Sequence, residues 1–166
     1  MFYIHTNNNS MNQFGKIALG TYSLLIQYEK SISPEEAWLK TETTFKIISN
    51  NHHCPRNAFL GLYESKLLIN CSIQPITTKS NENKYYALIA VQILKSDGRI
   101  LKNNLLHKMN EKIGYSKKQY RDIADVVLAL WDADYIEKKI DLTEEIERLR
   151  KKINPSVDDI LGDLDI

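Results

Sequence analysis

The feature that most constrains the fold is the stretch from Cys54 to Ile69, CPRNAFLGLYESKLLI, which is the densest apolar helix pattern in the chain. Pro55 suits the first turn of a helix, so Cys54 is expected to cap it. Gly61 is expected to let a neighbouring helix approach closely. Apolar residues three and four positions apart predict one buried stripe, made of Ala58, Phe59, Leu62, Tyr63 and Leu67.

The same spacing predicts further helices along the chain, over residues 12–30, 34–49, 83–95, 101–113 and 117–131. The strongest start signal is Ser33-Pro34-Glu35-Glu36, where Ser33 can cap the helix and Pro34 suits its first position. Residues 2–4 and 71–76 are the only candidate strands. The buried stripes are expected to include Ile26, Phe45 and Leu101. The sequence therefore predicts an all-α fold, a single compact bundle of about six helices with a C-terminal helix and an acidic tail.

Changes in character along the chain predict four segments. Residues 1–11 form a poorly ordered lead-in, with Met11 as an alternative start, and residues 12–140 form the helical domain. Residues 141–153 carry a heptad-like seam that is too short to be stable alone and is expected to dock on the domain. Residues 154–166 form an acidic tail with interleaved apolar residues.

Composition excludes several classes of protein. The formal net charge is +1, so no overall field indicates a nucleic-acid or membrane-surface protein. No apolar run approaches the length of a membrane span, and the N-terminus lacks the features of a secretory signal. Two cysteines, Cys54 and Cys71, are too few for a disulfide scaffold. These observations predict a cytoplasmic protein with reduced thiols.

Two segments of the chain echo each other. LGLYESKLL, from Leu60, and LALWDADYI, from Leu128, share an order of aliphatic, small, aromatic and acidic residues. Convergence of two buried helix ends is the favoured interpretation, and a duplicated helical unit is the alternative. Glu64 and Asp132 lie near the predicted helix C-termini, where the helix dipole disfavours anions. They are therefore expected to have cationic or hydrogen-bonding partners, or a functional use.

A candidate ligand site begins at His52-His53-Cys54-Pro55-Arg56, because a helix N-terminus with added donors can bind an anion. Such a site would combine Cys54, Arg56, Glu64 and Asp132, provided that they converge on one pocket. The favoured structural interpretation is a buried Cys54 cap and an Arg56 paired with an acid such as Glu64 or one of the aspartates. The spacing of histidines and cysteines predicts no metal site, and no motif predicts a catalytic residue or a cofactor.

A basic cluster offers an alternative. Lys117, Lys118 and Arg121 open a predicted helix, as in the recognition helix of a DNA- or RNA-associated regulator. Such clusters are more often a solvated face, and the near-neutral net charge also argues against this function.

The central stretch resembles the Cys-Pro-Arg-x-Ala-Phe-Leu-Gly-Leu signature of a family of small bacterial proteins of unknown function. Residues 11–15, 33–38, 85–95 and 125–131 are similar to other parts of that family, so the resemblance covers most of residues 11–136. It implies no activity. That family usually has glycine where this chain has Asn57, Lys66 and Asp134. If the turn at Lys66 is left-handed, the lysine costs on the order of 1 kcal/mol.

Three functions follow, in order of preference. The first is a non-catalytic protein-interaction or binding module, with a protein partner or self-association through residues 141–166. The second is the DNA- or RNA-associated regulator. The third is a small-ligand or anion-binding protein, or an enzyme, centred on the Cys54-Pro55-Arg56 helix start.

Overall fold

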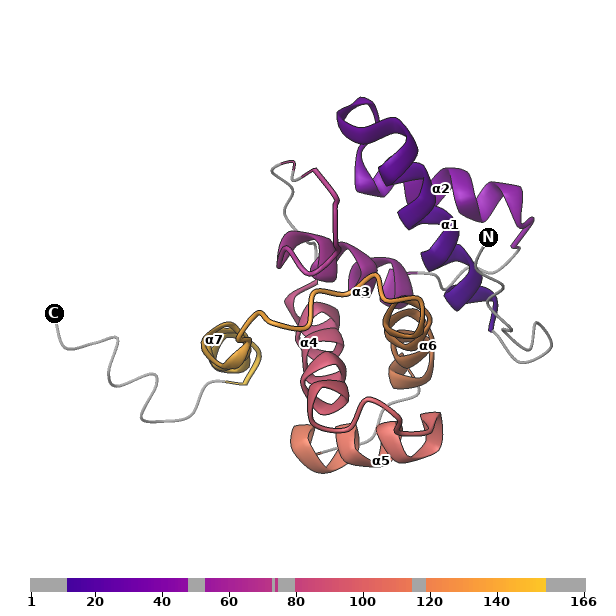
Figure 1. Ribbon diagram of the computed structural model, residues 1–166. Coiled ribbons are helices and arrows are strands. Elements are labelled where there is room, and N and C mark those ends of the chain that lie inside the picture. The colour runs from indigo at the N-terminus through magenta and orange to yellow at the C-terminus, as the bar shows by residue number, and fades with distance from the viewer. Residues whose placement is uncertain (1–11, 48–52, 73, 75–79, 115–118, 155–166) are drawn as a thin grey trace, which may run out of the picture.

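The computed structural model describes residues 12–47, 53–72, 74, 80–114 and 119–154. Within them the chain is all-α, which confirms the predicted fold class (Figure 1). Seven α-helices and one 3-10 turn follow in the order α1 (Gln13–Tyr28), η1 (Glu29–Ser31), α2 (Pro34–Thr44), α3 (His53–Glu64), α4 (Asn81–Ser96), α5 (Lys102–Ile113), α6 (Gln119–Asp132) and α7 (Thr143–Ile153).

The core is formed where α3, α4 and α6 pack against one another. The hairpin of α1 and α2 covers one side through contacts of α1 with α6 and of α2 with α3, and α5 lies across α4 and α6. The last helix, α7, packs on α4, so α2 and α7 lie on opposite sides of the molecule (Figure 1). As a result α4 is enclosed on several sides, and from Asn83 to Leu94 every residue except Gln92 is buried.

Side-chain caps define three of the helix starts. The Asn12 carboxamide accepts a hydrogen bond from the Phe14 amide at 2.8 Å, and Ser80 accepts one from the Asn83 amide at 3.2 Å. Ser33 accepts one from the Glu36 amide at 3.2 Å, with Pro34 as the first helical residue. This confirms the predicted start of α2, since a capping oxygen satisfies an amide that has no partner within the helix.

Glycine allows two helix pairs to approach closely. A Cβ atom at Gly61 would lie 2.8 Å from Cβ of Lys84 and 2.9 Å from its Cα, and one at Gly20 would lie 2.7 Å from Cγ2 of Thr41. The predicted role of Gly61 is thus confirmed, and α4 is the helix that it admits. Gly20 does the same for α1 and α2.

The two echoed segments end in the same turn. The Leu67 amide donates to the Leu62 carbonyl, five residues earlier, at 3.0 Å. The Tyr135 amide donates to the Leu130 carbonyl, also five residues earlier, at 2.9 Å. The residue before each is left-handed, with φ of 62° at Lys66 and 59° at Asp134. These are Schellman-type helix ends, in which glycine is usual because it has no Cβ to clash.

The two turns also meet each other through an isolated antiparallel bridge between Leu68 and Ile136. On one side the Ile69 amide donates to the Tyr135 carbonyl at 2.9 Å. On the other side, the Glu137 amide donates to the Leu67 carbonyl at 2.7 Å. Equivalent positions thus pair reciprocally, which gives the two helix ends a local two-fold relation. The two-fold relation does not extend to the helices that follow. The helix after α3, which is α4, packs along α3, whereas the helix after α6, which is α7, packs on α4.

Several local predictions are wrong. Cys54 does not cap α3, because the helix already includes His53. Ile26, Phe45 and Leu101 are exposed rather than buried. Phe45 follows the last residue of α2 and Leu101 precedes the first residue of α5, so neither lies on a helical stripe. Residues 71, 72, 74 and 80 form no strand, and residues 2–4 lie outside the described residues.

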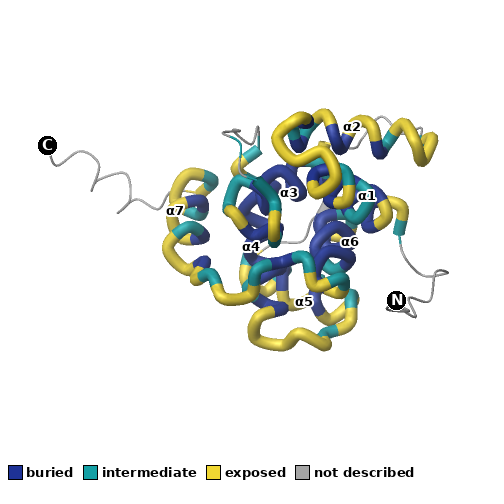
Figure 2. Tube along the Cα trace, turned by 45° about the horizontal axis from the view of Figure 1, so that its top comes forward, coloured by how far each residue is buried: buried dark blue, intermediate teal, exposed yellow. Residues whose placement is uncertain are grey.

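The C-terminal helix α7 uses its apolar seam to reach the core. Leu142, Ile146 and Leu149 are buried, while the outer face of the helix is exposed (Figure 2). The tail after residue 154 lies outside the described residues. Across the described helices, none has both the length and the apolar character required to cross a bilayer.

Candidate functional site

The four residues predicted to form a ligand site do not converge. Cys54 and Arg56 lie in the first turn of α3 and Glu64 is its last residue, so a helix rise of 1.5 Å per residue separates Cys54 from Glu64 by ~15 Å. Asp132 is the last residue of another helix, α6. One pocket therefore cannot contain all four side chains.

At the start of α3, Arg56 contacts a neighbour on its own helix. Its guanidinium lies 3.0 Å from Nδ1 of His53, while its Nε is buried without a hydrogen-bond partner among the described residues. Cys54 is half-buried, and His52 lies outside the described residues. Arg56 does not pair with Glu64, which sequence reasoning had offered as a partner.

Glu64 instead has the cationic partner that its position at a helix C-terminus requires. Its carboxylate lies 3.4 Å from Nζ of Lys84, and Glu145 of α7 lies 2.9 Å from the same atom. Lys84 is only 3% exposed, and the Ser65 hydroxyl donates to Glu145 at 3.0 Å. These residues form a buried ionic cluster that joins α3, α4 and α7.

Sequence reasoning missed Lys84, because a lysine in a helical pattern is normally assigned to the solvent face. The one available signal was the unexplained Glu64, whose position called for a cation.

The second acid, Asp132, lies in a different environment. It is exposed, yet desolvation by nearby protein atoms raises the pKa of its carboxyl, Lys138 lowers it, and Asp134 raises it again. Lys138 pairs with Asp134 at 2.9 Å and lies 4.5 Å from the centre of the Trp131 ring. Lys138 thus pairs with Asp134 and only partly offsets the charge of Asp132.

The space where α3 and α6 end is filled by an aromatic side chain from α1. The ring of Tyr22 stacks on Tyr135 with centroids 4.0 Å apart, and its hydroxyl donates to the Ile69 carbonyl at 2.7 Å. Burial, with nearby Cys71 and Tyr135, raises the pKa of Tyr22 to about 12. Burial also raises the pKa of Cys71 to about 11, so its thiol is protonated at neutral pH and is a poor nucleophile.

A second buried ion pair joins α5 and α6. Nζ of Lys102 lies 2.6 Å from Oδ1 of Asp125, and Oδ2 of Asp125 is buried without a hydrogen-bond partner among the described residues. Burial raises the pKa of Asp125, although Lys102 opposes the shift. Of the predicted nucleic-acid cluster, Arg121 is exposed, whereas Lys117 and Lys118 lie outside the described residues.

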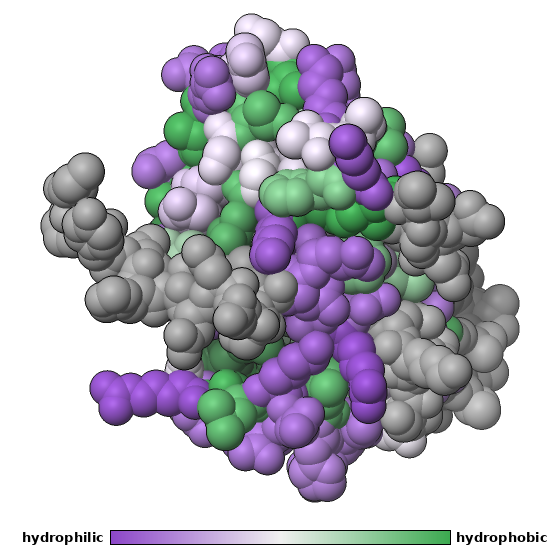
Figure 3. All heavy atoms as spheres, turned by 90° about the vertical axis from the view of Figure 1, so that its right-hand side faces the viewer, coloured by the Kyte–Doolittle hydropathy of each residue, from purple (hydrophilic) through white to green (hydrophobic). Residues whose placement is uncertain are grey.

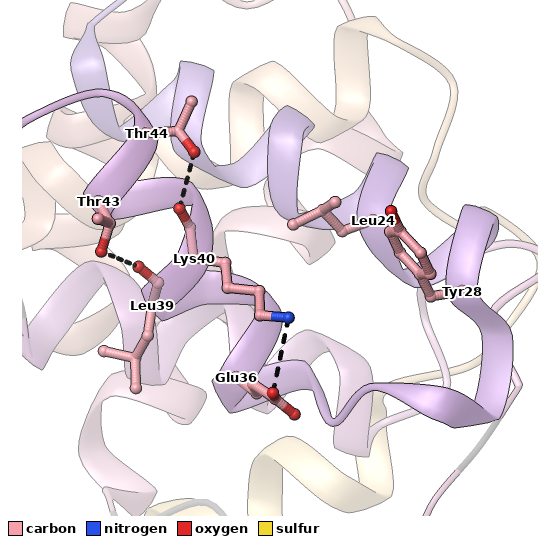
Figure 4. Close-up of a pocket in the computed structure, with 7 residues that line it drawn as sticks. All are labelled: Leu24, Tyr28, Glu36, Leu39, Lys40, Thr43 and Thr44. Atoms are coloured by element: carbon pink, nitrogen blue, oxygen red, sulfur yellow. Dashed lines mark hydrogen bonds and ion pairs between the residues drawn. The ribbon is translucent and has the colours of Figure 1, made fainter.

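A concave feature lies elsewhere, between the end of α1 and the outer face of α2. It has a volume of about 480 Å³ and is shown in close-up in Figure 4. We call it the hairpin groove, and it is lined by Leu24, Tyr28, Glu36, Leu39, Lys40, Thr43 and Thr44.

Exposed apolar side chains are concentrated on the same two helices. Of the five large hydrophobic residues that are exposed in the described chain, four belong to the α1–α2 hairpin or cap it: Ile26, Tyr28, Leu39 and Phe45. Figure 3 shows hydrophobic residues interspersed with hydrophilic ones over the upper part of the molecule. The fifth, Leu101, lies apart at the start of α5.

The polar groups of the groove are occupied by their own helix. The Thr43 hydroxyl donates to the Leu39 carbonyl and the Thr44 hydroxyl to the Lys40 carbonyl, both at 2.9 Å. Lys40 and Glu36 lie 3.7 Å apart, with side chains 61% and 56% exposed. The groove therefore offers apolar contact and one weak, solvent-accessible ion pair.

Most of these features lie within the part of the chain that matches a known family. A family described as "Family of unknown function (DUF6979)" matches residues 11–137. The chain belongs to this family. The match includes the hairpin groove, the paired turns and Lys84, but not α7, so Glu145 lies beyond it. No curated protein and no solved structure shows significant similarity to the chain.

Across the described ranges, no cluster of three or more histidine, cysteine, aspartate or glutamate side chains has an arrangement suitable for binding a metal ion.

Proposed function

We propose that this DUF6979 member is a non-catalytic protein-interaction module and that the hairpin groove is its binding surface. The observation that carries the proposal is the concentration of exposed large hydrophobic side chains along α1 and α2. Exposed apolar surface commonly marks a site of protein association, and two of these side chains, Tyr28 and Leu39, line the groove itself.

The chemistry of the groove favours a protein over a small molecule. A small-ligand pocket combines an apolar lining with a few polar groups that orient the ligand. Here the two threonine hydroxyls donate to their own helix, and Glu36 pairs with Lys40. The surface that remains consists of Leu24, Tyr28 and Leu39, which suits the apolar face of another helix.

The test is site-specific photo-cross-linking in cells of the source organism. A photoreactive phenylalanine derivative replaces Leu39 in the full chain, and cross-linked products are identified by mass spectrometry. The matched control carries it at Leu101, which is 74% exposed but lies on α5. A protein cross-linked at Leu39 and not at Leu101 supports the proposal. No product at Leu39, or the same products at both positions, refutes it.

The C-terminal region is a second predicted contact. A partner or a second copy bound through residues 141–166 would meet the charged outer face of α7 and the tail, because Leu142, Ile146 and Leu149 already pack on the core. We also propose a bacterial origin and a cytoplasmic location, supported by the resemblance of the central signature and by the composition.

A further inference from the structure

The partner that fits the hairpin groove is a second copy of this chain. Resting on the proposed function, we infer that two copies associate through their α1–α2 hairpins about a two-fold axis beside Leu39. Two antiparallel hairpins that pack face to face form a four-helix arrangement, which is a common way to bury the outer stripe of a helical hairpin.

Charge complementarity supports this choice. A two-fold contact brings the same patch of both copies together, so the patch must be complementary to itself. Residues 12–47 contain four lysines and four glutamates and no other charged residue, so two hairpins approach without net repulsion. A partner with charges of one sign only, such as a basic helix or an acidic peptide, would gain no net electrostatic attraction from these balanced charges.

The positions of the charges within the groove also define how α2 of one copy aligns with α2 of the other. Glu36 and Lys40 lie one helical turn apart on α2, on either side of the turn that contains Leu39. Antiparallel packing of α2 on its copy places Lys40 opposite the partner's Glu36 and Glu36 opposite the partner's Lys40. The existing pair within each α2 is exposed and long, at 3.7 Å, so exchanging these two pairs for two pairs between the copies loses little.

The apolar residues fit the same register. Leu39 is 44% exposed and points away from Leu24 and Tyr28 of its own copy (Figure 4), so its side chain is available to contact the second copy. Tyr28 and Leu24, from α1, form the wall that receives it. Gly20 holds α1 and α2 together closely, so the receiving surface is preformed.

The experiment measures the mass of the full chain in solution by light scattering and by sedimentation over a range of concentrations. The parent is expected to show a concentration-dependent dimer, and Leu39→Glu is expected to be monomeric with an unchanged helical circular dichroism spectrum. Glu36→Lys or Lys40→Glu should each raise the dimer dissociation constant by about tenfold or more, because like charges then face each other twice. Matched exposed controls on α5, Glu111→Lys and Lys108→Glu, should leave it unchanged.

Exchanging the charges at positions 36 and 40 is the decisive part of the experiment. Equal amounts of Glu36→Lys and Lys40→Glu chains should form a mixed dimer at least as tight as the parent, since each charge then meets its opposite. The chain with both substitutions should also dimerise as the parent does. A monomeric parent, a dimer insensitive to Leu39→Glu, or a mixture that fails to pair would overturn the inference.

Failure here is distinct from failure of the proposed function. If cross-linking at Leu39 captures a different protein while the parent is monomeric, the groove is an interaction surface and only the second copy is wrong. If cross-linking at Leu39 captures nothing, both are wrong.

Discussion

Lys84→Met tests whether the buried ionic cluster holds the C-terminal helix to the core. Lys84 is 3% exposed, and its ammonium lies 2.9 Å from Glu145 and 3.4 Å from Glu64. Methionine retains an unbranched apolar stem of similar length against Gly61, so the close approach of α3 and α4 survives. What the substitution removes is the positive charge between two carboxylates.

The size of the effect follows from the burial of the partners. Removing one member of a fully buried ion pair costs ~3–5 kcal/mol, because the other charge is left without compensation. Here the side chains of Glu64 and Glu145 are 30% and 26% exposed and can recover part of their hydration. Glu145 also keeps the Ser65 hydroxyl at 3.0 Å and Arg148 at 3.6 Å. We therefore expect a loss of about 2 kcal/mol in the free energy of unfolding.

Urea unfolding measures this loss through two buried tryptophans, Trp38 and Trp131, together with circular dichroism. A double-mutant cycle with Glu145→Gln should show a coupling energy of about 1 kcal/mol. Lys108→Met, on the exposed face of α5, serves as the control and should change stability by less than ~0.5 kcal/mol. The reasoning is refuted if Lys84→Met is as stable as the parent, since the desolvation of the ammonium would then cancel its attractions.

Four further substitutions probe single features by the same unfolding measurement. Lys66→Gly should stabilise the protein by about 0.5–1 kcal/mol because Lys66 has φ of 62°, and Asp134→Gly should gain less because aspartate tolerates this region better; no gain at Lys66 would contradict this. Gly61→Ala should lose about 1–3 kcal/mol because its Cβ would meet backbone of α4 at 2.9 Å; an unchanged stability would show that α4 can shift. Burial raises the pKa of Asp125 above its ordinary 3.8, so the folded state binds its proton more tightly than the unfolded state. Stability from this group is therefore present at lower pH and is lost as pH rises through the raised pKa. The stability of Asp125→Asn relative to the parent should therefore increase as pH rises above 3.8, and an identical pH profile would refute the assignment.

Much of the fold could be predicted because it depends on local chemistry. The cap at Ser33 and the close approach at Gly61 each follow from one residue type in a recognisable setting. The shared turn after the two echoed helices was visible as a sequence similarity, and its left-handed residues, Lys66 and Asp134, occupy the positions where glycine was expected.

The candidate site could not be predicted in the same way, because it depends on which helices become neighbours. A stripe of apolar residues indicates a face but does not say whether that face is covered, so Phe45 was assigned to the core although it is exposed. Conversely, α4 is enclosed by α3, α5, α6 and α7, and this packing buries Lys84 at a position where the pattern alone favours solvent. Arg56 and Glu64 were combined into one site, although they lie near opposite ends of the twelve-residue helix α3.

The C-terminal helix gives the sharpest separation between core and appended surface. Removing residues 141–166 takes away Leu142, Ile146 and Leu149, whose burial contributes roughly 1.5–3 kcal/mol each, and leaves Lys84 with Glu64 alone. That loss approaches the whole stability of a typical domain, which is about 5–15 kcal/mol, so the shortened chain should be unfolded or loosely packed.

Removing only residues 155–166 keeps the buried side chains of Leu142, Ile146 and Leu149 and both carboxylates beside Lys84, so it should leave circular dichroism and urea unfolding unchanged. If both truncations fold equally well, α7 is not part of the core. If both unfold, residues beyond 154 also support it. Only the predicted split, with one chain folded and the other not, places the boundary of the folded unit at the end of α7, beyond the family match that ends at residue 137.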